Sequence, residues 1–415
     1  MKEGANSSRR KMRGTQLLLI VLVLLSQSNL VRERKAEYAH ETRAVLSFLD
    51  REFWDQEEGG FFSNPYGKPL KLCHEQALVA LAHLEMYNAT AESRYLERAE
   101  EIIDHLREYV GEEGGCSRVI SDVPLYYPTE QANALSAFCE AYRTTGNNEY
   151  RETYRQIAGF LLEHLCWPKG NTRRVRAWWE GANGTWEEAQ TSAVYFETAA
   201  SLFKAYKVDG NQTYLDAAKQ ILLGSERFWD QSNYGYVHSK TDSLRYARDH
   251  GLATMAYLAA YDVTNRKDYL QRARDILFIV VSRMGDEMSR TFYESVTEKG
   301  EIQERRKTAD HLLLVRAYIY ANRVTYEDKY LRQAEELLDS ILNRAYDESS
   351  GAFTDLIGGG VMGDLEVQAY GAIGLVEAYR VLRVGASPMI AIVVLSVLVI
   401  LVGFMAYLFK TSWPY

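Results

Sequence analysis

The 415-residue sequence lacks the marks of several common protein classes. Its net charge of −8 gives no basic footprint of the kind that binds nucleic acid. It has only four cysteines and no CxxC pair, so neither a zinc motif nor a thioredoxin-like motif is indicated. No metal-ligand spacing stands out either. We therefore expect no metal, no other cofactor and no nucleic-acid partner.

The few cysteines fit an oxidising compartment without requiring one. Cys73 precedes one predicted helix and Cys116 follows the antiparallel partner of that helix, so both fall at the same end of the pair. That arrangement allows a disulfide bridge. Cys139 lies inside a helical stretch and is expected in the core, whereas the sequence leaves the role of Cys166 open.

Long uncharged runs occur only near the two ends of the chain. Basic residues at 9–13 precede an apolar run at 17–25 and small polar residues at 26–28, which is typical of a signal peptide. An uncleaved anchor is the alternative, although the run is short for a membrane span. Residues 388–409 carry no charge over 22 positions, enough to cross a bilayer. We expect an N-terminal segment at 1–31, a membrane helix at 388–409 and a tail at 410–415.

The charge around these runs predicts the orientation of the protein. A basic N-terminus favours the inside of the membrane, so the domain at 36–384 is expected outside, anchored in the cell membrane by one C-terminal helix. Sequons at Asn88, Asn183 and Asn211 support an exterior glycoprotein. The lipid bilayer is thus one expected partner.

Between the ends, an apolar helical unit occurs six times. HEQALVALAHLEMY from His74 aligns with TEQANALSAFCEAY from Thr129, and related units begin near residues 189, 249, 310 and 367. One column of the six units holds Gln or His at intervals of 55 to 61 residues: Gln76, Gln131, Gln190, His250, His311 and Gln368. A fixed period of this kind indicates a repeat architecture.

A second, more charged helix follows five of the units. The first helices are apolar nearly all round, as buried helices are, and the second carry charge on one face. An amphipathic segment at 36–52 has no inner partner and the sixth inner helix has no outer one, so pairing them closes a ring. The predicted fold is an all-α (α/α)6 toroid of six helical hairpins. An open solenoid is the alternative, but tetratricopeptide repeats span about 34 residues.

A turn with the pattern aromatic-Asp-Gly-aromatic connects outer helices to inner ones. It reads FWDQEEGGFF from Phe53, FWDQSNYGYV from Phe228 and AYDESSGAF from Ala345. Gly allows a tight reversal and the aromatic rings can cover helix ends. We interpret these turns as structural.

In such a ring the N-termini of all six inner helices meet at one end, where polar ligands are favoured. The candidate catalytic residues at this end are Glu75, Glu130, Asp249, His250, Asp310 and His311. The adjacent pairs at 249–250 and 310–311 are the sharpest candidates, because a carboxylate and an imidazole can transfer protons. Ordinary capping by first-turn acids and a structural hydrogen-bond ring of Gln and His are the alternatives.

Candidate binding residues lie at the same end. They are Gln76, Gln131, Gln190, Arg248, Lys307, Gln368, Trp178 and Trp179. The two tryptophans precede the third inner helix, where indole rings either stack on sugars or form an ordinary hydrophobic lid.

The string FWDQEEGGFFSNPYGKPLK, followed by an EQA helix and then RYLERAEEI, resembles the superfamily of N-acylglucosamine 2-epimerases and six-hairpin glycosidases. It is most similar to the helical domain of prokaryotic proteins that also carry a thioredoxin-like domain. The resemblance covers about residues 36–384 and implies the toroid and a carbohydrate ligand. Epimerases of this kind use histidines on the eighth and twelfth helices. Here the eighth holds His250, but the twelfth has no histidine, so His311 on the tenth would have to substitute. The adjacent Asp-Asp pair of the mannan hydrolases is absent.

Two classes of function remain open from the sequence. The first is a carbohydrate-active enzyme, either a glycoside hydrolase with two carboxylates across the pocket or a sugar epimerase with two bases. The second is a non-catalytic glycan-binding or scaffold module at the cell surface. The fold does not choose between them.

Overall fold

The computed structural model describes residues 31–384 apart from positions 68, 122–123, 181–187 and 232–234. The chain divides into two units, of which one, Glu41–Ala378, contains the helical ring. In the described part no helix has the length and apolarity needed to cross a membrane. The predicted membrane helix at 388–409, the tail and residues 1–30 lie outside the described residues.

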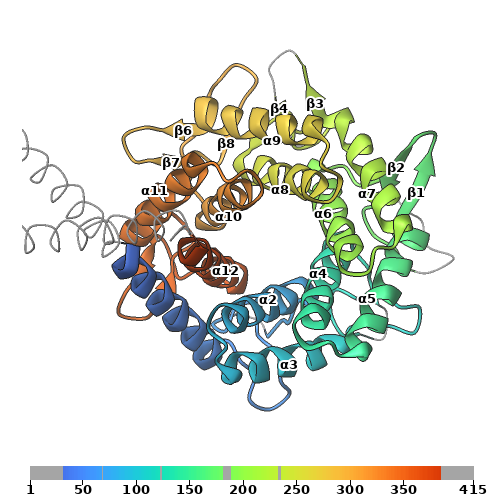
Figure 1. Cartoon of the computed structure of the whole chain (residues 1–415), viewed down its shortest axis with the longest axis horizontal. Helices are drawn as coiled ribbons and strands as arrows, with labels where there is room; N and C mark the ends of the chain where they lie inside the picture. Colours follow the sequence, from blue (N-terminus) through green and yellow to red (C-terminus); the bar gives the residue numbers. More distant parts are fainter. Residues whose placement is uncertain (1–30, 68, 122–123, 181–187, 232–234, 385–415) are drawn as a thin grey trace, which may run out of the picture. The chain divides into compact units, whose positions relative to one another are not determined.

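Six helices form the inner wall of a toroid and alternate along the chain with outer helices (Figure 1). The inner helices are α2 (Cys73–Thr90), α4 (Pro128–Thr145), α6 (Ser192–Asp209), α8 (Ala247–Thr264), α10 (Thr308–Thr325) and α12 (Leu365–Val384). The outer ones are a helix at 31–52, then α3 (Ser93–Arg107), α5 (Asn148–Phe160), α7 (Gln212–Ser225), α9 (Lys267–Ile279) and α11 (Asp328–Ala345). The predicted (α/α)6 toroid is confirmed, and so is the unpaired first helix, which already includes residue 31, the first described residue, and not only residues from 36 onward.

The ring is closed by α12, which lies between α10 and α2 (Figure 1). Gly374 of α12 lies against Leu312 and Val315 of α10. On the other side, the backbone N–H of Leu365 donates to the carbonyl of Ser63, in the segment leading to α2. An open solenoid has no such contacts between its last and first repeats.

Small antiparallel hairpins connect outer helices to inner ones. They are β1–β2 (Cys166–Lys169, Thr172–Val175), β3–β4 (Trp229–Asp230, Gly235–Tyr236), β6–β7 (Gly285–Asp286, Thr291–Phe292) and β10–β11 (Tyr346–Asp347, Ala352–Phe353). A further sheet joins β5 (Arg245–Tyr246), β8 (Ser295–Val296) and β9 (Ile302–Gln303). Short helices η1 (Leu161–Leu165), η2 (Glu226–Phe228) and η3 (Val280–Met284) end three outer helices.

The repeated aromatic turn is structural, as the sequence predicts. Trp54 pairs with Phe61 through a bridge, and their rings stack edge to face at 5.0 Å. The guanidinium of Arg98 lies 3.8 Å from the Trp54 ring. At the equivalent place Arg272 lies 4.1 Å from Trp229. Each hairpin is thus fastened to the outer helix that follows in the next repeat unit.

All four cysteines are buried thiols. Cys73 and Cys116 lie at the same end, as predicted, close enough for Cys116 to raise the pKa of the Cys73 thiol, and no bridge joins them. Cys139 lies in the core, also as predicted. Among the sequons, Asn88 donates to Glu140 and Thr144, and Asn211 caps α7 by accepting from Thr213, so both side chains have roles within the fold.

Gly60 should tolerate no side chain. Its φ is +76°, and a Cβ there would lie 2.3 Å from Nε2 of His105. We expect Gly60→Ala to lower the free energy of unfolding by about 2–4 kcal/mol, because left-handed strain and a clash add. Gly159 lies in helix α5 with nothing within 4 Å of a Cβ, so Gly159→Ala should instead stabilise by about 0.5–1 kcal/mol. Denaturant unfolding measures both, and equal effects would contradict this account.

Candidate active site

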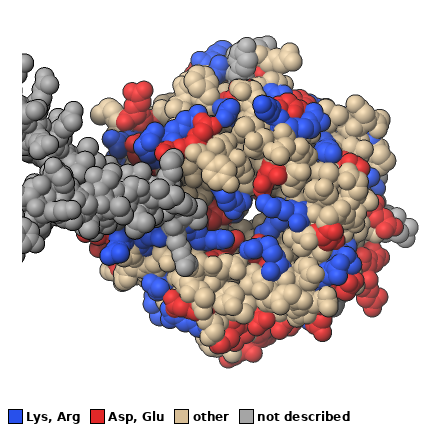
Figure 2. All heavy atoms as spheres, in the orientation of Figure 1, with Lys and Arg blue, Asp and Glu red and all other residues tan. Residues whose placement is uncertain are grey.

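The N-terminal turns of the inner helices bring ionisable side chains from around the ring together. His74 and Glu75 come from α2, Glu197 from α6, Asp310 from α10 and Glu366 from α12, and each interacts electrostatically with residues of other inner helices. On the face drawn in Figure 2 the molecule is hollowed at the centre of the ring, and side chains of both charges surround the hollow. The convergence predicted from the repeat is therefore real.

Arg248 of α8 contacts several members of this cluster. Its Nη2 donates to Oε1 of Glu366 at 2.8 Å and lies 3.9 Å from Oε1 of Glu197. Its guanidinium also lies 6.0 Å from the ring of Tyr370. Burial alone would raise the pKa of Glu366, but the charge of Arg248 and its hydrogen bond outweigh burial and hold that pKa below its ordinary value. Arg248 and Glu366 are therefore a fixed ion pair.

Two other carboxyl groups at this end of the ring behave differently. Burial raises the pKa of Asp310 to about 7, against the lowering effect of Arg248 and Lys307. Burial likewise raises the pKa of Glu75 to about 7, partly offset by His74 and by the hydroxyl of Ser63, which donates to Glu75. Among the described residues, no hydrogen bond engages the Asp310 carboxyl group. Both groups can hold or release a proton near neutral pH.

Two histidines are each oriented by a carboxylate. Nδ1 of His74 lies 3.2 Å from Oε1 of Glu130, and Nδ1 of His238 lies 2.8 Å from Oδ2 of Asp249. The hydroxyl of Ser192 also donates to Asp249. Burial opposes protonation of His74, but Glu130 outweighs it and raises its pKa, while the hydrogen bond to Asp249 raises that of His238. Asp249 thus pairs with His238 of the preceding loop and not with its sequence neighbour.

The comparisons with known proteins agree with this architecture. The family model of N-acylglucosamine 2-epimerase (GlcNAc 2-epimerase) matches residues 6–118. A GH76 alpha-mannanase from Bacteroides thetaiotaomicron superposes with a TM-score of 0.72 at 15% identity, covering 84% of this chain and 97% of its own. The chain has the toroid fold shared by six-hairpin glycosidases and sugar 2-epimerases. The resemblance inferred from the sequence is confirmed at this level.

Other solved structures with this toroid come from a different chemistry. A cellobiose 2-epimerase from Bacillus thermoamylovorans has a TM-score of 0.69 at 16% identity, covering 83% of this chain and 99% of its own. A D-mannose isomerase has a TM-score of 0.67 at 14% identity, covering 82% and 97%. No curated protein matches the chain. At these identities the likeness shows the fold alone.

The Gln and His column of this toroid fastens the hairpins. The amide of Gln76 accepts from the backbone N–H of Phe61 and donates to its carbonyl, both at 2.7 Å. Gln368 makes the same two bonds to Phe353, and Gln131 makes them to Cys116. These three glutamines, expected as binding residues, are saturated by backbone groups.

The two column histidines are engaged in the same way. Nε2 of His250 accepts from the N–H of Tyr236 at 3.2 Å, and Nε2 of His311 accepts from the N–H of Phe292 at 2.9 Å. In both rings the other nitrogen bonds the carbonyl four residues earlier. Burial lowers the pKa of both, that of His311 to about 4. The geometry favours the structural alternative for this pair, since neither ring has a free nitrogen.

The sequence alignment misplaced one member of the column. Gln190 precedes α6, is exposed, and donates only to the carbonyl of Glu188. The residue at the equivalent helical position is Tyr195, whose hydroxyl accepts from the N–H of Val175 at 3.3 Å. A tyrosine breaks the Gln/His pattern, so matching residue type led to the wrong register. Tyr195 is the fourth residue of α6, just as Gln76 is the fourth residue of α2, so counting from the helix start identifies it.

The remaining predicted binding residues have mixed positions. Trp179 is buried and packs on Tyr126 and Phe160, which favours the lid interpretation, whereas Trp178 is half-buried. Nζ of Lys307 forms an ion pair with Oε1 of Glu294 at 2.6 Å. The sequence analysis did not identify Glu294 as a candidate. His238, Glu197 and Glu294 were all missed, because each lies outside the first turn of an inner helix.

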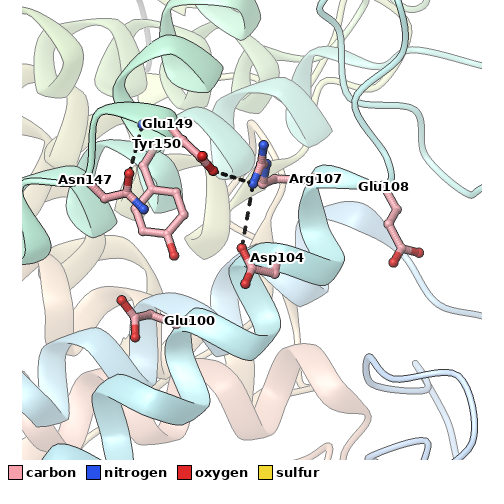
Figure 3. A pocket seen from close by; sticks show the side chains of 7 residues that line it. All are labelled: Glu100, Asp104, Arg107, Glu108, Asn147, Glu149 and Tyr150. Carbon is pink, nitrogen blue, oxygen red and sulfur yellow. Dashed lines mark hydrogen bonds and ion pairs between the residues drawn. The ribbon is translucent and has the colours of Figure 1, made fainter.

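A second hollow lies on the outer surface between α3 and α5 (Figure 3). It is open and mostly acidic, and its one cation, Arg107, is bound by Glu149 at 2.9 Å and faces Asp104 at 3.9 Å. No buried proton-transfer group faces it. We therefore place the candidate site at the end of the ring.

Glutamine should replace His311 without loss of the fold, because the column itself alternates these residues. We expect His311→Gln to cost less than about 1 kcal/mol of unfolding free energy and His311→Ala to cost about 2–3 kcal/mol, since Ala leaves the N–H of Phe292 unpaired. A sugar-turnover assay on His311→Gln adds a second readout. Abolished turnover in a stably folded His311→Gln protein would restore the catalytic assignment.

The same histidine predicts an acid limb of stability. Its pKa is about 4 in the folded chain against about 6.5 when unfolded. The unfolded chain therefore binds more protons in that window, and stability should fall as pH drops from about 6.5 to about 4. Denaturant unfolding at several pH values measures this. Between pH 6.5 and 4 the unfolding free energy should change less with pH in His311→Gln than in the wild type.

Proposed function

We propose that the ring end is the active site of a carbohydrate-active enzyme of glycoside-hydrolase type. The observation that carries the proposal is the buried carboxyl group of Asp310, which titrates near neutrality beside the Arg248–Glu366 ion pair. Hydrolysis of a glycosidic bond needs one carboxyl group as acid and another as base or nucleophile. Asp310 and Glu75 are buried carboxyl groups whose pKa is raised to about 7.

Each group has a defined task in this proposal. The protonated member of the Asp310–Glu75 pair donates to the leaving oxygen, and the ionised member activates water or attacks the sugar. The fixed charge of Arg248 stabilises the ionised form of the carboxylates around it and orients sugar hydroxyl groups through its remaining N–H donors. The toroid is shared with a GH76 alpha-mannanase, which supports hydrolysis as the reaction class. The adjacent Asp pair expected from the resemblance to mannan hydrolases is absent here.

Sugar epimerisation is the second candidate. It is favoured by the two His–carboxylate pairs, His74–Glu130 and His238–Asp249, in which a carboxylate holds Nδ1 and orients the ring for proton transfer at Nε2. These replace His250 and His311 as the candidate bases. A non-catalytic glycan-binding module would need neither these pairs nor the perturbed carboxyl groups.

We also propose that the enzyme is anchored in the cell membrane with the toroid outside. The support is the uncharged segment at 388–409, the basic N-terminal segment and the sequons. Membrane fractionation and protease protection of the full chain in cells test this. A toroid protected from external protease in intact cells would contradict it.

Asp310→Asn should raise the stability of the protein and lower its turnover. The folded pKa of about 7 lies above the ordinary value of 3.8, so the folded chain favours the protonated form, and stability present at low pH is lost as pH rises through about 7. The Asn variant avoids that cost and should unfold at a free energy about 1–3 kcal/mol higher at pH 8. Turnover should nevertheless fall by about 100-fold or more.

The assay is a hydrolysis and epimerisation screen over mono- and oligosaccharides. Wild-type turnover should peak near pH 7, because one carboxyl group acts as acid and the other as base. Asp268→Asn, in the first turn of outer helix α9, is the matched control and should keep full activity. Full turnover in a folded Asp310→Asn protein would refute the role, and loss only in His74→Asn or His238→Asn would favour epimerisation. Sugar binding without turnover would favour the glycan-binding module.

A further inference from the structure

The segment that leads into α2 runs beside the segment that leads into α4. The backbone N–H of Cys73 donates to the carbonyl of Arg118 at 3.0 Å, and the hydroxyl of Tyr109 donates to the carbonyl of Lys71 at 3.3 Å. These bonds fix the first residue of α2 against the loop between α3 and α4. Cys116 lies two residues before Arg118 in that loop, where it forms an antiparallel bridge with Val110.

Cys116 is held firmly in this position. Its N–H donates to Oε1 of Gln131 at 2.7 Å, and its carbonyl accepts from the same amide. Cys73 and Cys116 are both fully buried, and the Cys116 side chain is close enough to raise the pKa of the Cys73 thiol. Among the described residues, the charged groups that shift the pKa of the other two thiols are Lys204, Asp209 and Glu140 for Cys139 and Arg173 for Cys166.

From this juxtaposition we propose that Cys73 and Cys116 form a disulfide that fastens the first turn of α2 to the loop before α4. In the exchange, the Cys73 thiolate attacks a small-molecule disulfide such as oxidised glutathione and releases one glutathione thiolate. The Cys116 thiolate then attacks the Cys73 sulfur and releases the second. The two cysteines lose two electrons, glutathione disulfide gains them, and the two cysteine protons pass to the released thiolates.

Burial decides when this exchange takes place. Both sulfur atoms are inaccessible in the folded chain, so the oxidant reaches them before the segments at 71–73 and 109–118 close on each other. Once the fold is complete, the same burial protects the bond from reductants. The bridge belongs to a protein that folds in an oxidising compartment, which agrees with the proposed exterior position.

The bridge also bears on the candidate site. Cys73 directly precedes His74, and the bridged loop carries Arg118, whose Nε lies 3.9 Å from Oε1 of Glu130. Glu130 in turn orients His74. The disulfide therefore connects both halves of the His74–Glu130 pair, although its existence does not depend on the proposed enzyme activity.

The test uses the full-length chain refolded in a mixture of reduced and oxidised glutathione. Free thiols are then alkylated, and peptides are mapped by mass spectrometry without reductant. We expect a linked peptide containing Cys73 and Cys116, two hydrogen atoms lighter than the separate peptides, and alkylated Cys139 and Cys166. Four alkylated cysteines, or Cys73 joined to either of the other two, would overturn the proposal.

Thermal unfolding supplies an independent readout. The bridge closes a loop of about 40 residues, for which a rise in Tm of roughly 5 °C or more over the reduced protein is expected. Cys116→Ser should show no such difference between oxidising and reducing conditions. The double variant Cys139→Ala and Cys166→Ala should keep the full difference. An equal rise in Cys116→Ser, or no rise in the wild type, would refute a constraint at this position.

Discussion

The hydrogen bonds between one side chain of each inner helix and the hairpin before it are the interaction on which this toroid depends. A hairpin that turns from an outer helix into an inner one buries backbone groups that need partners. Gln76 supplies both a donor and an acceptor to Phe61, and His311 supplies an acceptor to Phe292. Tyr195 does the same for Val175 with a hydroxyl. Three chemically different side chains meet one requirement, the supply of an acceptor to a buried N–H.

This fastening has a consequence for the chemistry of the ring end. Because each hairpin is tied to the same turn of its helix, the first turns of the inner helices are held at a common level. Acidic residues of these turns are ordinary partners of a helix N-terminus in isolation. In the buried ring Arg248 pairs with Glu366, and burial outweighs the remaining cations at Asp310 and Glu75, so that these two carboxyl groups favour the protonated form.

The roles of the histidines follow from their tertiary contacts and not from their neighbours in the sequence. His250 and His311 each follow an aspartate and look like acid–base pairs, yet their rings bond backbone groups on both nitrogens. Asp249 instead orients His238, which comes from the loop before the helix. Buried neutral imidazoles that bond backbone serve the fold, whereas partly exposed imidazoles held by a carboxylate are suited to proton transfer.

The sequence by itself determined the period, the alternation of apolar and amphipathic helices and the unpaired first helix, and these sufficed for the toroid, because helix burial follows directly from side-chain pattern. It also predicted that polar side chains of the inner helices converge at one end of the ring. Only the tertiary structure decided which polar residues face one another there. The contacts of Arg248 with Glu197 and Glu366, and of His74 with Glu130, join different helices. The pKa of Asp310 likewise depends on burial by the whole ring, which no local pattern encodes.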